Sequence, residues 1–331
     1  MESPFLAKEL WGGFFITGYG IEGDEIMSGI VVEKILEMFI LIFAGVVVYK
    51  AKLIDETVSK NLSNLLLLVV SPLLIFEAYQ MNFHRKLFHG LLWALLASLI
   101  TLLSCMVLAF FMFPGKKDNH QLEKIGTIYS NCSFIGIPLV NGVFGSEGVF
   151  YMTAYNTIFD ILLWTFGVWV MSSETDWKSS LKELINPAIV SVMVGMVCFL
   201  SGFRLPEIVM TPVELIGGMN TPLAMMVAGI NLARGDLLKS MKNRRLYFIC
   251  FVKLVLFPLL SIAILYPMQL DFTIAFTVFI GMACPSGATT IMFSERYGKN
   301  TSYATEIFVM TTFLALLTIP LVSIPAAYFL Q

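Results

Sequence analysis

The chain has 331 residues, of which 57% are hydrophobic and 13% are charged, and its formal net charge at pH 7 is -2. Soluble domains are about one quarter charged, so this composition excludes an ordinary soluble protein and predicts an all-α polytopic membrane protein in the lipid bilayer. Nucleic acid is excluded as a partner, because nucleic-acid binding needs a clustered basic surface.

Apolar runs bounded by proline, glycine or charge predict the membrane crossings, since each helix needs roughly 20 apolar residues to span the bilayer. Residues 1–28 lack the basic segment and cleavage site of a signal peptide and are rich in glycine, so we expect a flexible or interfacial N-terminal extension. Ten spans follow, at residues 31–49, 61–80, 88–113, 125–144, 147–171, 187–202, 209–232, 246–267, 271–295 and 304–330.

The distribution of basic residues predicts the orientation, because short cytoplasmic loops are enriched in lysine and arginine. If both termini lie outside, the inner connections hold 15 of the 21 lysines and arginines. We therefore expect a multi-pass protein of the plasma membrane with both termini on the non-cytoplasmic side.

Two proline landmarks recur at nearly the same offset. Ser71-Pro72-Leu73 in the second span is matched 150 residues later by Thr221-Pro222-Leu223 in the seventh. Gly136-Ile137-Pro138 in the fourth span is matched by Cys284-Pro285 in the ninth. Because each half has an odd number of spans, the second half has the opposite orientation in the membrane. The predicted fold is thus ten transmembrane helices in two inverted five-helix repeats, residues 29–171 and 187–331, joined by a cytoplasmic linker at 172–186.

The prolines predict that helices 4 and 9 are broken near the middle of the membrane and cross there. Inverted repeats with such broken helices build many secondary transporters, whose substrate sites lie at the break. A half-helix that restarts after a break presents free N–H groups and a positive dipole end, which favour a carboxylate. The candidate substrate-binding residues are Asn131, Ser133, Gly136, Pro138, Asn141, Cys284, Pro285, Ser286, Gly287 and Thr289.

Two charged residues lie inside predicted spans, where an ionised side chain is costly and normally faces a cavity or a partner. Asp160 is near the middle of the fifth span, and Asn156 lies one turn earlier on the same face. Lys253, in the eighth span, either extends to the cytoplasmic surface or contacts the substrate or Asp160. Asn156, Asp160 and Lys253 are candidates for coupling to a proton or sodium ion, or for a charge pair.

The cysteines and histidines give no sign of a metal site or a hydrolytic centre. The five cysteines lie in apolar stretches without CxxC spacing, and His84, His89 and His120 lie in or beside polar connections. No histidine is therefore available in the apolar interior to ligate a metal or to activate a nucleophile. We expect no enzyme activity, no metal and no cofactor.

Several segments together resemble the auxin efflux carrier family, especially its bacterial malate and malonate permeases. They are Asn186 to Ala188, Gly202 to Pro206, Thr221 to Ala224, Gly229 to Ala233, Cys284 to Ser286 and Phe293 to Gly298. The resemblance covers residues 31–330 and implies a fold related to bile acid and sodium transporters. It also implies that spans one, two, six and seven form a scaffold and a homodimer interface, while the other six spans carry substrate in an elevator-like movement.

The resemblance favours a small carboxylate as the substrate over auxin, because only Ser172 to Asn186 joins the halves where many plant carriers have a long loop. The predicted function is a secondary active transporter of small organic anions such as dicarboxylates. Two alternatives use the same broken helices: an anion channel, and a membrane-embedded sensor that binds an anion without moving it.

Overall fold

The computed structural model describes residues 22–115, 118–172 and 186–331, and these are helical with no β-strand among them. The first half contains α2 (Glu22–Lys50), α3 (Glu56–Leu65), η1 (Leu66–Val70), α4 (Ser71–Ala78), α5 (Arg85–Met112), α6 (Asp118–Ile128), η2 (Cys132–Gly136), α7 (Ile137–Leu162), η3 (Leu163–Gly167) and α8 (Val168–Met171). The second half contains α10 (Pro187–Ser201), α11 (Glu207–Gly218), α12 (Asn220–Arg234), α13 (Leu237–Lys242), α14 (Arg244–Phe251), η4 (Val252–Leu256), α15 (Phe257–Leu265), η5 (Tyr266–Met268), α16 (Phe272–Ala283), α17 (Thr289–Arg296) and α18 (Thr301–Leu330).

Six helical stretches of the described residues are long and apolar enough to cross a membrane, which confirms an all-helical protein with several candidate spans. They are Glu56–Ala78, Arg85–Met112, Cys132–Met171, Glu207–Arg234, Arg244–Met268 and Thr301–Leu330. Two shorter apolar helices, α10 and α16, lie at the expected sixth and ninth spans. The count of ten spans in two inverted repeats stays a prediction.

The expected N-terminal extension and linker lie mostly outside the described residues, which omit 1–21 and 173–185. The helix α2 begins at Glu22, so the last residues of the expected extension are already helical.

Wider π-helical turns precede three of the prolines inside the spans. The turns η1, η2 and η4 end two residues before Pro72, Pro138 and Pro258. A proline has no N–H to donate and its ring crowds the carbonyl four residues earlier, so a wider turn relieves both problems. Two of the four prolines behind the predicted internal repeat, Pro72 and Pro138, therefore follow local irregularities of their helices.

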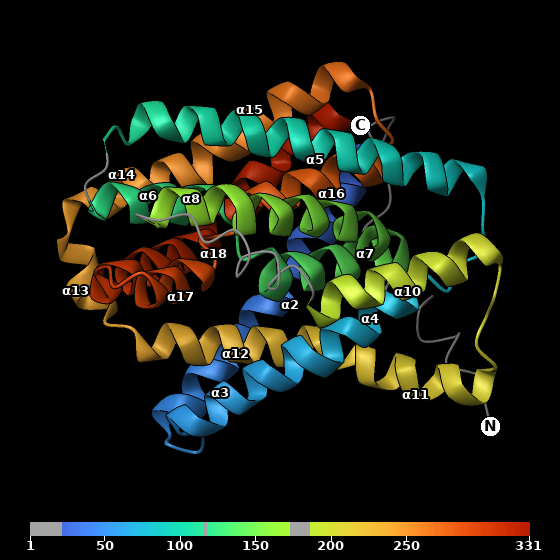
Figure 1. Ribbon diagram of the computed structural model, residues 1–331, viewed down its shortest axis with the longest axis horizontal. Helices are drawn as coiled ribbons and strands as arrows, with labels where there is room; N and C mark the ends of the chain where they lie inside the picture. Colours follow the sequence, from blue (N-terminus) through green and yellow to red (C-terminus); the bar gives the residue numbers. More distant parts are fainter. Residues whose placement is uncertain (1–21, 116–117, 173–185) are drawn as a thin grey trace.

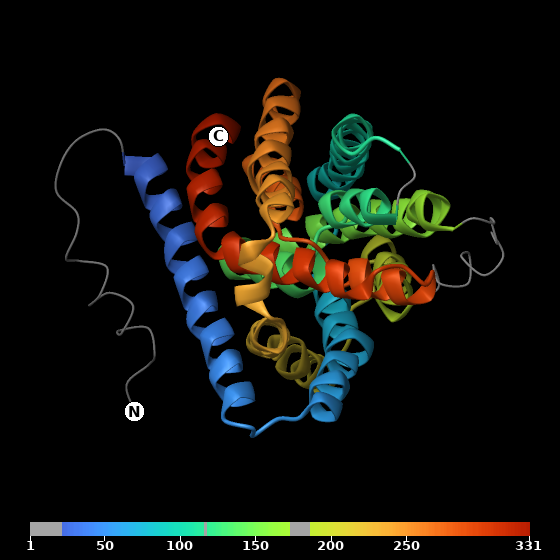
Figure 2. The same cartoon turned by 90° about the vertical axis from the view of Figure 1, so that its left-hand side faces the viewer.

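The helices form two groups (Figures 1 and 2). In the first group α2 lies along α12, and α4 packs against α10 and α11. In the second, α7 packs against α5 and α16, and α18 contacts α14, α15, α16 and α17. The family resemblance assigns the first group to the scaffold and the second to the substrate-carrying spans, and that assignment of roles stays a prediction. Contacts between the groups include those of α7 with α2, α4 and α12, and of α18 with α2.

The helices α2 and α12 touch backbone to backbone. A Cβ atom on Gly229 would lie 2.0 Å from the carbonyl oxygen of Ile42, and one on Gly45 would lie 2.2 Å from that of Met226. Small residues allow such close approach between helices in a membrane, where dispersion replaces the hydrophobic effect as the main attraction.

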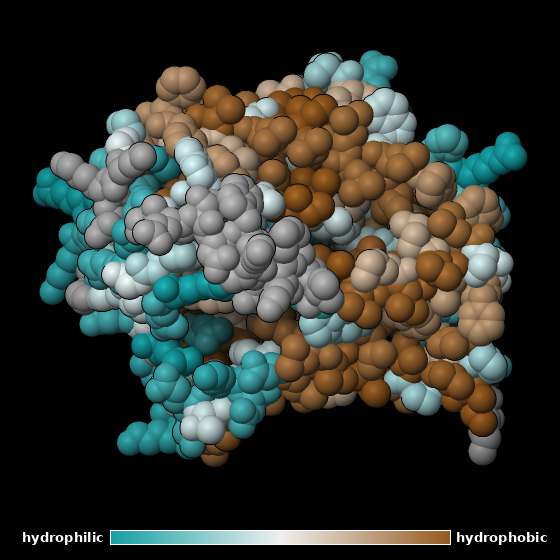
Figure 3. All heavy atoms as spheres, in the orientation of Figure 1, coloured by the Kyte–Doolittle hydropathy of each residue, from teal (hydrophilic) through white to brown (hydrophobic). Residues whose placement is uncertain are grey.

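Large apolar side chains cover much of the outer surface, as expected for a surface that faces lipid. Ile208 is 84% exposed and Phe111 is 77% exposed. In Figure 3, hydrophilic side chains gather at the left-hand end, where Figure 1 places α3, α6, α13 and α17, and apolar side chains cover the centre and right. On this face, the division is the one expected if lipid covers the apolar part and water covers the end where α3, α6, α13 and α17 lie.

Candidate functional site

The two predicted breaks lie side by side and cross. The chain leaves the helical conformation between α6 and η2, and again between α16 and α17. The N–H of Asn131 donates to the carbonyl oxygen of Pro285 at 2.7 Å, and the N–H of Gly287 donates to that of Tyr129 at 2.9 Å. These bonds make a short antiparallel pairing between Ser130 and Ser286. Backbone groups that lost their helical partners are thus satisfied by the opposite break.

Small side chains are necessary at the crossing. A Cβ atom on Gly287 would lie 3.2 Å from the carbonyl oxygen of Ser130. One on Gly136 would lie 2.5 Å from Cε of Met152 and 3.4 Å from Sγ of Cys284. Larger residues at these positions would separate the two breaks or displace their neighbours.

Lys253 joins the two breaks from a fully buried position. Its ammonium donates to Oγ of Ser130 at 2.5 Å and to the carbonyl oxygen of Met282 at 3.4 Å. Because the side chain is 0% exposed, it does not extend to the cytoplasmic surface, and that alternative is wrong. The two hydrogen-bond partners of Lys253 come from the two broken segments. Asp160 is not one of these partners.

Ser286 is also held within the crossing. Its Oγ donates to the carbonyl oxygen of Gly126, and its N–H donates to Oγ1 of Thr311 at 3.2 Å. It therefore links α17 and its preceding break to α6 and α18.

A pocket of about 40 Å³ lies beside the crossing, at the boundary between the two groups of helices. Ser133, Asn156 and Asp160, all predicted from the sequence, line it from η2 and α7. The other lining residues are Leu67, Ser71, Ile75, Ile137, Thr153, Thr157, Ala188, Ile189 and Val192. Of the ten predicted substrate-binding residues, Ser133 is the one that lines this pocket.

The remaining predicted residues lie in or near the crossing but outside the pocket lining. Asn131, Cys284, Pro285 and Gly287 are buried in the paired breaks, and Gly136 and Pro138 are buried in the half-helix that follows. Asn141 and Thr289 are half-buried.

Asp160 makes a hydrogen bond across the boundary between the two groups. Nδ2 of Asn186 donates to Oδ2 of Asp160 at 3.3 Å. The same Asn186 caps α10, because its Oδ1 accepts from the N–H of Ile189 at 3.0 Å. Asn156 is different: its Oδ1 is buried and accepts no hydrogen bond from the described residues.

Sequence reasoning missed Ser71, Thr153 and Thr157, which add hydroxyl groups to the pocket. Thr153 and Thr157 lie one turn apart on the helix face that also carries Asn156 and Asp160, so the helical spacing was an available signal. Ser71 adjoins the Pro72 landmark, and its Oγ donates to Oδ1 of Asn220 at 2.8 Å. Its place in the pocket depends on packing between distant segments.

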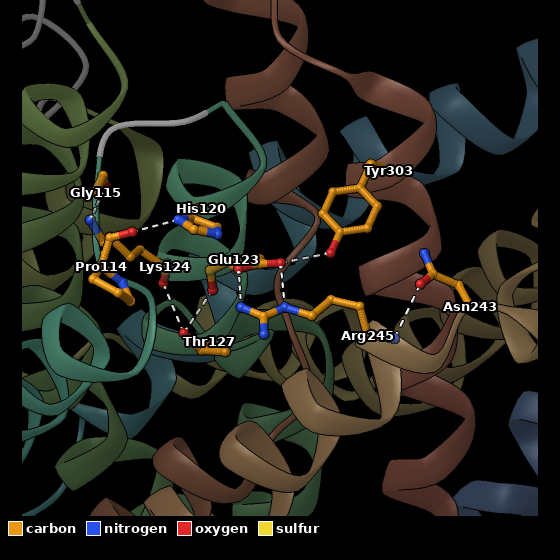
Figure 4. A network of polar contacts seen from close by, with 9 residues as sticks. All are labelled: Pro114, Gly115, His120, Glu123, Lys124, Thr127, Asn243, Arg245 and Tyr303. Carbon is orange, nitrogen blue, oxygen red and sulfur yellow. Dashed lines mark hydrogen bonds and ion pairs between the residues drawn. The ribbon is translucent and has the colours of Figure 1, made fainter.

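Sequence reasoning also missed an ion pair near the polar end (Figure 4). Glu123, which is 2% exposed, receives two hydrogen bonds from Arg245 at 2.9 and 2.8 Å and one from the hydroxyl of Tyr303 at 2.8 Å. These residues join α6, α14 and α18. Arg245 fits the enrichment of basic residues in inner loops, so the sequence pattern did not call for an acidic partner.

No three histidine, cysteine, aspartate or glutamate side chains lie together as a metal-binding group within 22–115, 118–172 and 186–331. A larger cavity, of about 600 Å³, lies between α2, α12 and α18 and is lined mostly by apolar residues. It contains none of the predicted site residues.

Comparison with known proteins identifies the class. Residues 30–323 match the family model of membrane transport proteins, so the chain belongs to this family, which is the auxin efflux carrier family that the sequence resembles. An uncharacterized transporter of Methanocaldococcus jannaschii is 23% identical over 61% of this chain and 68% of its own length. An uncharacterized transporter of Methanothermobacter thermautotrophicus is 21% identical over 88% of this chain and 97% of its own length.

Proposed function

We propose that the protein is a secondary active transporter that moves small organic anions, including dicarboxylates, across the plasma membrane by alternating access. The observation that carries this proposal is the pair of crossed breaks beside a polar pocket, at the boundary between two groups of helices. Membership in a family of membrane transport proteins supports this proposal and favours a carrier over an enzyme.

The start of the half-helix formed by η2 and α7 supports an anionic substrate. Ser133 lies in the first turn of this half-helix and lines the pocket. The first-turn N–H groups of a helix have no partners within it, and the dipole is positive at this end. A substrate carboxylate bound at Ser133 would receive hydrogen bonds from these groups and from the hydroxyl.

The position of the pocket supports an elevator-like movement. Ser71, Ile75 and Val192 line it from the α4 and α10 side, while Ser133 and Asp160 line it from the other group. A volume of about 40 Å³ has room for a few water molecules at most, so a dicarboxylate requires the two groups to move apart. Sliding one group past the other would expose the pocket first to one side of the membrane and then to the other.

The scaffold helices also offer a surface for a homodimer. On α11, Ile208 and Leu215 are highly exposed, and among the described residues this helix packs mainly against α4. We propose that dimers form through this group, so that the substrate-carrying group is free to move.

Counterflow in proteoliposomes tests the proposed function. Vesicles are loaded with unlabelled malate, malonate or buffer at equal inner and outer pH, and the entry of labelled malate is followed. Transient accumulation in malate-loaded vesicles, and none in buffer-loaded vesicles, is the expected result. Conductance without counterflow would indicate a channel, and stabilisation by malate without any flux would indicate a sensor.

A further inference from the structure

The pocket presents a charge conflict for an anionic substrate. Its lining contains one carboxylate, that of Asp160, and no lysine, arginine or histidine. An anion bound at Ser133 would share a small, partly buried space with that carboxylate. Two like charges so close together repel strongly where water is scarce, so one negative charge must be neutralised when the anion binds.

No described cation is placed to neutralise Asp160. The elements η1 and α10 contain no charged residue. The charged residues of α4 and α12, Glu77 and Arg234, do not line the pocket. From η2, the Cys132 thiol lies within electrostatic range of both Asp160 and Lys253. Lys253 itself donates to Ser130 and Met282 within the crossing.

The hydrogen bonds around Asp160 leave a place for a donor. Nδ2 of Asn186, on the α10 side, donates a hydrogen bond to Oδ2 of Asp160. One helical turn before Asp160, the buried Oδ1 of Asn156 accepts no hydrogen bond from the described residues. A buried acceptor without a donor is costly, and a proton on Oδ1 of Asp160 supplies one donor, either to Asn156 or to a bound carboxylate.

We propose that Asp160 takes up one proton with each anion, so that the protein carries anion and proton together. This inference rests on the proposed transport of anions. The proton passes from water on the loading side to the Asp160 carboxylate and returns to water on the releasing side, and no bond of the substrate changes. After release, the ionised Asp160 recovers its hydrogen bond from Asn186.

Net uptake under a proton gradient tests this inference in proteoliposomes with the membrane potential held at zero. Wild type should accumulate malate about tenfold for each unit by which the outside is more acidic, because moving one proton down a tenfold ratio can raise the anion ratio tenfold. A pH electrode should record one proton entering with each malate anion. Malate entry without proton entry would overturn the inference.

Substitutions of Asp160 test whether this residue takes up the proton. In Asp160→Asn, malate accumulation should no longer respond to the gradient, while Asp160→Glu should restore the response. The matched control is Asp55→Asn, an exposed helix cap, which should keep the wild-type response. An Asp160→Asn protein that still accumulates malate about tenfold for each pH unit would overturn the inference.

A binding measurement decides the case in which Asp160→Asn carries no malate. Calorimetry in two buffers of different ionisation enthalpy gives the number of protons taken up on malate binding. One proton for wild type and none for the variant supports the inference, and equal numbers overturn it. If wild type shows no counterflow at equal pH, the proposed function fails. If counterflow occurs but net malate uptake brings in no proton, only the coupling is overturned.

Discussion

At the scale of single residues, the most informative side chain is Lys253. A fully buried lysine is rare because burying its charge costs free energy that only good hydrogen bonds recover. Here the ammonium donates to Ser130 beside one break and to Met282 beside the other. We interpret Lys253 as a fixed cationic link that keeps the two breaks paired, separate from the polar pocket beside them.

Lys253→Met keeps the volume and removes both hydrogen bonds. We expect the initial rate of malate counterflow to fall at least tenfold, because a lost charged hydrogen bond is worth about 1.5–3 kcal/mol and the paired breaks would loosen. Lys60→Met, at an exposed position of α3, is the matched control. A well-folded Lys253→Met protein with the wild-type rate would remove this lysine from the account.

At the scale of elements, sequence reasoning located the breaks but not the full pocket. Proline acts locally, so Pro138 and Pro285 predict irregular helices wherever the rest of the chain lies. The pocket depends on packing instead: Ser71 reaches it because α4 packs beside α7, which no short-range pattern reveals. The link between Glu123 and Arg245 escaped prediction for the same reason, since 122 residues separate them.

The contact between α2 and α12 gives a prediction about packing. Gly229→Ala should lower the free energy of unfolding by about 1–3 kcal/mol, because the added methyl group meets the backbone of Ile42 and neither helix can yield. Thermal unfolding in detergent measures the effect. Gly218→Ala, where an added Cβ meets nothing within 4 Å, is the control, and equal unfolding temperatures for the two variants would contradict the prediction.

The link between α6, α14 and α18 gives a second prediction at this scale. Arg245→Ala should destabilise the protein more than the double variant Arg245→Ala, Glu123→Gln, because the single change leaves a buried carboxylate without its partner. Since the Arg245 side chain is 42% exposed, we expect a coupling energy of only about 1–2 kcal/mol. A double-mutant cycle on unfolding free energies measures it, and additive effects would argue against the link.

At the scale of the whole molecule, the distribution of basic residues predicts which end faces the cytoplasm. The polar end contains the start of α14, whereas α5 begins at the opposite end (Figure 1). Replaced by cysteine in a Cys198→Ser background, the 85% exposed Lys86 should react with a membrane-impermeant maleimide in intact cells, and the exposed Arg244 should react only after permeabilisation. The reverse pattern would invert the predicted orientation.

The central claim is that a substrate anion binds at the start of the half-helix beside the crossed breaks. The most direct measurement is malate counterflow, as a function of malate concentration, in wild type, Ser133→Ala and the matched control Ser104→Ala, whose hydroxyl only donates to its own helix. We predict that Ser133→Ala raises the half-saturating concentration about tenfold, because it loses a hydrogen bond to a charged group, and that Ser104→Ala leaves it unchanged. An unchanged half-saturating concentration in a folded Ser133→Ala protein would contradict the account.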